Sequence, residues 1–171
     1  MEEFCKGAAP AFDALFKRHA RPIKSFLARA CGNLAAAEDL TQLTFLSLAR
    51  ARDRFRPGSR FKPWIYAIAL NAARDYRRQH REELLPDGQL PTSLAAEPAP
   101  VQDAPLEKAV RRALEQLPDK LREAIVLHRF EGLSFGEIAE IEGVSPVAVR
   151  VRAHRGYEQL RELLRGTWEG P

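Results

Sequence analysis

FKPWIYAIALNAARDYRRQHR, residues 61–81, is the stretch of the chain from which the fold is best predicted. Its apolar side chains recur every three or four residues, which is the period of one face of an α-helix; they are Phe61, Trp64, Ile65, Ile68, Ala72 and Tyr76. Pro63 suits the first helical turn, where its missing N–H costs nothing. Polar and basic residues lie off this stripe: Asn71, Arg74, Arg77, Arg78 and Arg81. The stretch therefore predicts a helix with an apolar face toward a core and a basic face, which either contacts an anionic partner or is only solvated.

Two helices are expected before this stretch. Residues 9–31 carry a helical apolar stripe, and Pro22 inside it predicts a kink or two abutting helices. Gly32 can end this segment and Asn33 can cap the next one. The second helix, residues 35–52, has a predicted core face and an adjacent second face. The core face comprises Leu40, Thr44, Phe45 and Leu48, and the second face comprises Asp39, Gln42, Leu43 and Leu46.

Residues 84–105 differ from the rest of the chain in composition. They contain five prolines and no basic residue, and no apolar period continues through them. This composition is typical of a flexible linker. The sequence therefore predicts an all-α protein of two small helical domains, residues 1–83 and 106–171, joined by a Pro-rich linker.

The second predicted domain carries the signals of a helix-turn-helix. Helices are expected at residues 106–117 and 120–130, on either side of Pro118. Ser134 and Glu137 have the spacing of a capping box, and Gly143 allows a tight left-handed turn. Ser145 caps a last helix that runs to about Arg165, with Gly156 as a weak point. A helix, a short glycine turn and a helix form this motif.

The last helix has the charge of a DNA-recognition helix. Arg150, Arg152, His154 and Arg155 follow its start, with no acidic residue before Glu158. A recognition helix places such residues against base edges and phosphates. A helical hairpin with a basic surface is the alternative, and we favour DNA binding because the capping box, the turn and the charge agree.

Composition and charge narrow the functional classes. The net charge is +4, but residues 1–83 hold 16 Lys and Arg against 9 Asp and Glu, whereas residues 106–171 hold 11 of each. A basic N-terminal half fits a nucleic-acid partner. No apolar run approaches the roughly 20 residues of a membrane helix, so a cytoplasmic protein is expected. Two cysteines and four scattered histidines form no metal-ligand spacing, and no catalytic constellation or phosphate-binding loop is present. We therefore expect no enzyme activity, metal, cofactor or small-molecule substrate.

Two motifs resemble bacterial RNA polymerase sigma factors of the extracytoplasmic-function (ECF) group. The pattern F-x-x-W-I-Y-x-I-A-x-N-x-A-x-D-Y-x-R, beginning at Phe61, is similar to their promoter-melting region. The run from Glu131 to Arg152 is similar to the region that reads the minus-thirty-five element. The resemblance covers about residues 9–83 and 106–165. It implies that the N-terminal domain docks on the polymerase, melts DNA and reads the minus-ten element.

The resemblance also implies the site residues. The run from Glu38 to Phe45 is similar to the docking surface for the polymerase clamp, so Asp39, Gln42, Leu43 and Leu46 are the implied contacts; Leu43 stands where the family has an acidic residue. The loop of residues 53–60 would capture a base flipped out of the minus-ten element. The implied minus-ten contacts are Arg56, Arg60, Lys62, Asn71, Arg74, Arg77 and Arg78. The implied minus-thirty-five contacts are Ser145, Val147, Ala148, Arg150, Val151, Arg152, His154 and Arg155.

The expected partners follow from the same resemblance. They are core RNA polymerase, through the clamp of its largest subunit and its flap, promoter DNA, and an anti-sigma factor of the kind that is commonly membrane-bound. Ala148 and Val151 depart from the family pattern, so promoter preference does not carry over from relatives. A stand-alone helix-turn-helix repressor or activator is the rival interpretation, with an adaptor that does not bind DNA as a third.

Overall fold

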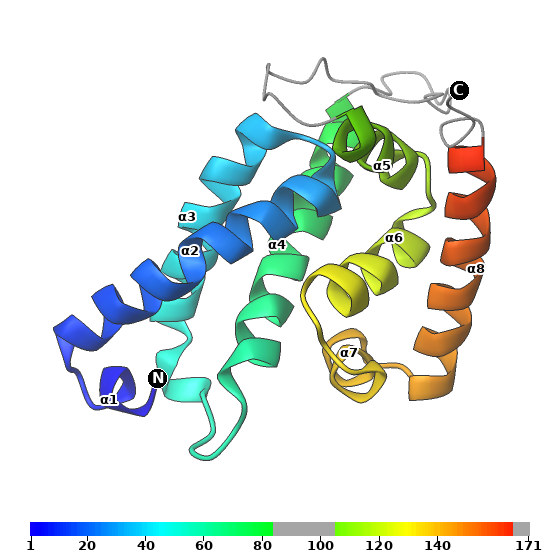
Figure 1. Ribbon diagram of the computed structural model, residues 1–171. Helices are drawn as coiled ribbons and strands as arrows, with labels where there is room; N and C mark the ends of the chain where they lie inside the picture. Colours follow the sequence, from blue (N-terminus) through cyan, green and yellow to red (C-terminus); the bar gives the residue numbers. More distant parts are fainter. Residues whose placement is uncertain (84–104, 166–171) are drawn as a thin grey trace.

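The computed structural model describes residues 1–83 and 105–165, which form an all-α fold (Figure 1). Within these residues every regular element is helical, so the predicted fold class is confirmed. The predicted linker lies outside the described residues, except for Pro105, the first residue of α5. We call residues 1–83 the N-terminal lobe and residues 105–165 the C-terminal lobe.

The N-terminal lobe is built from α1 (Glu2–Cys5), α2 (Ala9–Cys31), α3 (Leu34–Arg50), the 3₁₀ turn η1 (Arg52–Arg54) and α4 (Phe61–Glu83). Gly32 ends α2 in the left-handed conformation, with a φ of 69°, as expected. The side chain of Asn33 accepts a hydrogen bond of 3.0 Å from the Ala36 N–H and so caps α3, also as expected.

Helix α2 passes through Pro22 without a break. It is one helix of 23 residues, so the alternative of two abutting helices is wrong. Proline removes one backbone hydrogen bond from a helix interior. The turns that follow it bury Ile23, Phe26 and Leu27 completely, and this burial offsets the loss.

Helix α4 lies between the other helices of its lobe and the C-terminal lobe (Figure 1). Phe61, Trp64 and Ile68 of the predicted stripe are only partly buried. The completely or almost completely buried residues are Ile65, Tyr66, Ala69, Leu70 and Ala73. The buried face is therefore wider than the predicted one, because α7 covers α4 on a side that the sequence pattern assigned to no partner.

The C-terminal lobe contains the predicted helix-turn-helix. Its elements are α5 (Pro105–Glu115), α6 (Asp119–Ile125), a π-helical turn η2 (Val126–Phe130), α7 (Phe135–Glu142) and α8 (Pro146–Leu164). The capping box of Ser134 and Glu137 forms, Gly143 adopts a φ of 67°, and Ser145 caps α8. Ile138, Ala139 and Val149 are buried where α7 and α8 cross, so this part of the prediction is confirmed.

Gly156 has a packing role that the sequence did not suggest. It is buried where α6 and α8 meet, and a Cβ at this position would lie 2.5 Å from Cδ1 of Ile125. The absence of a side chain lets the two helices approach closely. Helix α8 continues through Gly156 despite the poor helix propensity of glycine, and the close packing gives a reason for a glycine at this position.

The two lobes pack against each other. Helix α4 contacts α7, and α2 contacts α5, α6 and η2. Buried side chains of both lobes belong to one continuous apolar core. In the part of the chain that the structure describes, no helix is long and apolar enough to span a membrane.

Candidate nucleic-acid interface

The second face of α3 is exposed, as the sequence predicted. Asp39, Gln42, Leu43 and Leu46 all face solvent, and Leu43 and Leu46 are 52% and 53% exposed. The opposite face of the helix holds the buried Leu40, Phe45 and Leu48. Two leucines beside a carboxylate and an amide form a small apolar patch with a polar rim, which is the composition of a protein-docking surface.

The loop between α3 and α4 is anchored to α4 and carries two exposed arginines. Phe55 is buried against Trp64, with ring centroids 5.1 Å apart, and this contact fixes the loop to α4. Arg56 and Arg60 are exposed beside it. The Gly58 N–H donates a hydrogen bond of 3.2 Å to the Glu2 carboxylate. The loop thus holds two exposed cations on an anchored backbone, and cations of this kind can follow the backbone of a single strand.

The basic face of α4 divides into exposed and covered residues. Asn71 and Arg78 lie toward solvent, whereas Arg74 and Arg77 point toward the C-terminal lobe. The Arg77 side chain is only 11% exposed. The predicted basic face therefore exists, but in this conformation a neighbouring lobe covers half of it.

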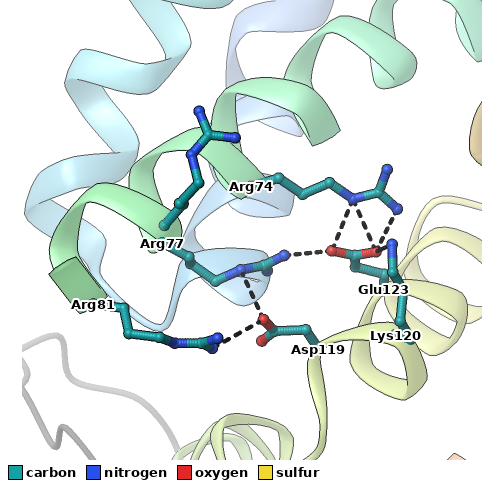
Figure 2. Close-up of a pocket in the computed structure, with 7 residues that line it drawn as sticks. Arg74, Arg77, Arg81, Asp119, Lys120 and Glu123 are labelled. Carbon is teal, nitrogen blue, oxygen red and sulfur yellow. Dashed lines mark hydrogen bonds and ion pairs between the residues drawn. The ribbon is translucent and has the colours of Figure 1, made fainter. Parts of the chain in front are cut away.

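A cleft of about 220 Å³ separates the basic face of α4 from α6 (Figure 2). Its lining residues are Arg74, Arg77, Arg78, Arg81, Asp119, Lys120 and Glu123. Nε of Arg74 lies 3.2 Å from both carboxylate oxygens of Glu123, and Nη2 of Arg74 lies 2.6 Å from Oε2. Arg77 donates to the other oxygen of Glu123 and also pairs with Asp119, with 3.5 Å between its Nε and Oδ2. One carboxylate is thus held by two guanidinium groups.

The environment of Glu123 keeps its carboxylate ionised. Burial alone raises the pKa of Glu123, but the Arg74 hydrogen bonds and the charge of Arg77 outweigh burial and hold the pKa below the usual value. Its side chain is 1% exposed. A carboxylate this deeply buried is stable only with its cations in place.

A second polar contact between the lobes centres on Glu131. Its carboxylate accepts a hydrogen bond from the Tyr66 hydroxyl and lies 3.7 Å from Nη1 of Arg29, while Lys62 donates to its backbone carbonyl. Burial raises the pKa of Glu131, and the Tyr66 hydrogen bond and the Arg29 charge offset only part of that effect. Just before α4, Arg60 pairs with Glu137, with 2.5 Å between Nη1 and Oε1.

Sequence reasoning missed Glu123 and Glu131. The local signal for Glu123 is the run Ala124-Ile125-Val126-Leu127, which has no polar face and so indicates a segment covered on more than one side. A charge next to such a run needs a partner. Nothing local identifies that partner, because Arg74 is 49 residues away in the sequence.

The predicted recognition face of α8 is exposed. Its solvent-facing residues are Ser145, Val147, Arg150, Val151, His154 and Arg155, while Ala148 and Arg152 are partly buried. Arg152 pairs with Glu142 of α7 and so ties the two helices of the motif together. The guanidinium of Arg150 lies 5.9 Å from the centroid of the Phe135 ring. The structure therefore brings the predicted basic residues together on one helix, but two of them have partners within the chain: Arg152 pairs with Glu142, and Nε2 of His154 lies 3.4 Å from the Glu158 carboxylate.

Cys31 lies beside the lobe interface and offers a probe of it. Its thiol is partly buried near Arg77, Arg122, Asp119 and Glu123, and burial raises its pKa to about 11. A free thiol has a pKa of about 8.5, so at pH 8 the Cys31 thiolate should be scarcer by about two orders of magnitude. In the Cys5→Ser variant, we expect Cys31 to react with a chromogenic disulfide reagent about a hundredfold more slowly than after denaturation. Equal rates before and after denaturation would contradict this environment.

Comparisons with known proteins identify both lobes. Residues 15–83 match the family model Sigma-70 region 2, and residues 107–160 match Sigma-70, region 4. The chain is 50% identical over 165 residues to the RNA polymerase sigma factor CarQ of Myxococcus xanthus, covering 96% of this chain and 95% of CarQ. It is 38% identical to the ECF RNA polymerase sigma factor SigE of Mycolicibacterium smegmatis, covering 93% of this chain and 63% of SigE.

A solved structure agrees in fold as well as in sequence. It is the co-crystal structure of the sigma factor RpoE in complex with the anti-sigma factor NepR from Bartonella quintana, with a TM-score of 0.77 and 28% identity. The match covers 91% of this chain and 97% of the other. Family models, relatives and fold agree, and the rival of a stand-alone helix-turn-helix regulator is not favoured. The chain belongs to the ECF group of RNA polymerase sigma factors, which bind core polymerase and direct promoter-specific transcription initiation.

Proposed function

We propose that three separate surfaces carry the sigma-factor function of this chain. Asp39, Gln42, Leu43 and Leu46 of α3 dock on the polymerase clamp. The second surface reads and melts the minus-ten element, and its residues are Arg56, Arg60, Lys62, Asn71, Arg74, Arg77 and Arg78. The third reads the minus-thirty-five element, and its residues are Ser145, Val147, Ala148, Arg150, Val151, Arg152, His154 and Arg155. The observation that carries this proposal is the pair of solvent-exposed leucines on α3, Leu43 and Leu46, in a protein whose family must bind polymerase.

The polymerase alone would catalyse RNA synthesis. This chain would select the promoter and hold the melted strand, and would contribute no catalytic group, metal or cofactor. It would act in the cytoplasm with the polymerase, whose clamp and flap would engage the N-terminal and C-terminal lobes. An anti-sigma factor is a further proposed partner, because RpoE, at 28% identity, was crystallised with one.

The docking face is tested by Asp39→Arg. The side chain is exposed and forms no ion pair with another described residue, so the fold should be retained. We expect core-polymerase binding to weaken about tenfold or more, because a like or unmatched charge at an interface costs more than the lost contact. Binding is measured by titrating labelled protein with core polymerase, and function by run-off transcription.

Asp13→Arg is the matched control for Asp39→Arg. Asp13 is also exposed, lies on α2 of the same lobe, and undergoes the same change of charge. The control should bind polymerase as the unmodified protein does. A folded Asp39→Arg variant that binds and transcribes normally would show that α3 does not dock in the way proposed.

A further inference from the structure

Carboxylates of the C-terminal lobe occupy cations that the proposed function assigns to DNA. Glu123 holds Arg74 and Arg77, Asp119 adds contacts to Arg77 and Arg81, and Glu137 holds Arg60. Glu142 Oε1 also lies 3.7 Å from Nη2 of Arg74, and the Glu131 carbonyl accepts a hydrogen bond from Lys62. Four of the seven proposed minus-ten residues are therefore contacted by the C-terminal lobe: Arg60, Lys62, Arg74 and Arg77.

We propose that this acidic face, formed by Asp119, Glu123, Glu131 and Glu137, is an intramolecular competitor of the minus-ten strand. We call the arrangement with the two lobes packed together the closed conformation. In this conformation the acidic face takes the place of DNA on α4, so the protein alone binds the melted strand weakly. The proposal rests on the proposed function, since it assigns a regulator to the same basic residues. Separation of the lobes would make these residues available.

The geometry of the Glu123 contact resembles that of a phosphate contact. A guanidinium group presents several N–H donors in a planar fork that matches either a carboxylate or a phosphate. Arg74 contacts both oxygens of Glu123, and Arg77 donates to one of them. Neither arginine can offer the same donors to a DNA phosphate while this arrangement lasts.

Burial distinguishes this contact from an ordinary surface ion pair. Exposed pairs contribute little, and many form without consequence. Glu123 is 0% exposed as a residue, and Lys120 adds a third cation 3.4 Å from its carboxylate. Tyr66, which donates to Glu131, is 2% exposed. The acidic face is therefore a packed interface with two buried centres.

Closure covers one DNA surface and leaves the other open. The residues of α8 that are proposed to read duplex DNA, including Arg150, Val151 and Arg155, are exposed in the same conformation. The closed protein should therefore bind a minus-thirty-five duplex while it binds single-stranded DNA poorly. This asymmetry separates a specific block from a general loss of DNA affinity.

The test removes the charge of Glu123 without changing its shape. Glu123→Gln, in a Cys5→Ser background, should bind a single-stranded DNA of about 12 nucleotides about tenfold more tightly by fluorescence anisotropy, since a hydrogen bond to a charged group is lost from the closed state. Cys31 should react about tenfold faster, because the lobes separate. Affinity for a minus-thirty-five duplex should be unchanged.

Glu140→Gln is the matched control. It makes the same change of charge in the same lobe, but Glu140 is exposed on α7 and forms no ion pair with an arginine of α4 in the described part of the chain. It should leave strand binding and the Cys31 rate as they are. If Glu123→Gln does not fold, Asp119→Asn, at a partly exposed position, should shift both readouts in the same direction.

Two outcomes would overturn the proposal. In one, a folded Glu123→Gln variant binds the single strand no more tightly and its Cys31 reacts at the original rate. In the other, Glu140→Gln produces the same gain, which would make the effect one of net charge. Run-off transcription by the unmodified protein at a saturating concentration tests the proposed function separately, because it reports promoter use by the complex with polymerase and not the conformation of the free protein.

Discussion

Replacing Arg150 by alanine is expected to weaken binding to a duplex carrying the minus-thirty-five element by roughly 5- to 150-fold, the range for loss of one bidentate base contact. Arg150 is exposed in the second turn of α8, and the first residues of a recognition helix are those that reach base edges. Its guanidinium lies over Phe135, which limits the directions in which it can point. We therefore expect Arg150 to contact a guanine base rather than a phosphate.

The measurement compares two duplexes, one with the element and one with the element scrambled. A base contact predicts that Arg150→Ala loses affinity only for the first duplex, whereas a phosphate contact predicts equal losses for both. Arg161→Ala is the control, because Arg161 is exposed about three turns further along the same helix. If neither Arg150→Ala nor Arg155→Ala changes binding to either duplex, α8 is not the recognition helix.

Arg152 should respond differently from Arg150. It is paired with Glu142, whose side chain is 1% exposed, so its removal leaves a buried carboxylate without that partner. Burial and the nearby Glu123 carboxylate already raise the pKa of Glu142. A loss of DNA affinity in Arg152→Ala would therefore report on the stability of the motif as much as on a direct contact.

The second large effect is expected on stability, for Gly156→Val. A Cβ at this position would lie 2.5 Å from Cδ1 and 3.2 Å from Cγ1 of Ile125, and 3.4 Å from Cβ of Leu121. Overpacking of a core costs about 1–3 kcal/mol, and the branched side chain places this variant at the upper end. A loss of about 3 kcal/mol should lower the melting temperature by roughly 6–12 °C. Thermal denaturation followed by circular dichroism measures it.

Gly136→Ala provides the matched control for this stability effect. Gly136 is also helical, but a Cβ added there would have Oγ of Ser134 as its nearest neighbour, 3.9 Å away. Alanine should therefore raise the stability by up to about 1 kcal/mol through helix propensity. A Gly156→Val variant that melts at the original temperature would mean that α6 and α8 do not approach as closely as described.

Local signals in the sequence were enough to predict the helices and their ends. The capping box at Ser134, the left-handed Gly143 and the cap at Asn33 depend on residues within a few positions of one another, so the chain reveals them directly. The exposed face of α3 followed from helical periodicity, because Leu40 and Phe45 bury one side and leave Leu43 and Leu46 on the other. These are properties of a single helix and its nearest neighbours.

Contacts between the lobes could not be read from the same signals. Tyr66 was not assigned to the core, and the two residues that accommodate its side chain are far away in the sequence: its ring packs against Phe26 and its hydroxyl donates to Glu131, 65 residues away. Arg77 was expected on an open basic face, and it is covered because Asp119 and Glu123 lie opposite it. The role of Gly156 could not be predicted for a related reason. It depends on the side chain of Ile125, which lies on another helix and packs against the glycine. Periodicity shows which side of a helix is covered, but not what covers it.

The acidic lining of the lobe interface has a consequence for how ionic strength acts on this protein. When free cations of a protein bind a single DNA strand, condensed counterions are released, and the logarithm of the affinity falls with the logarithm of the salt concentration by about 0.7 per phosphate neutralised. If Arg74 and Arg77 bind the minus-ten strand as proposed, they must first leave their carboxylates, which then recruit cations from solution. Each carboxylate exposed in this way binds cations from solution, and this uptake offsets part of the cation release from the DNA. When the closed protein binds the strand, its arginines exchange carboxylates for phosphates. The affinity for the strand should therefore depend on salt less steeply than the number of arginines implies.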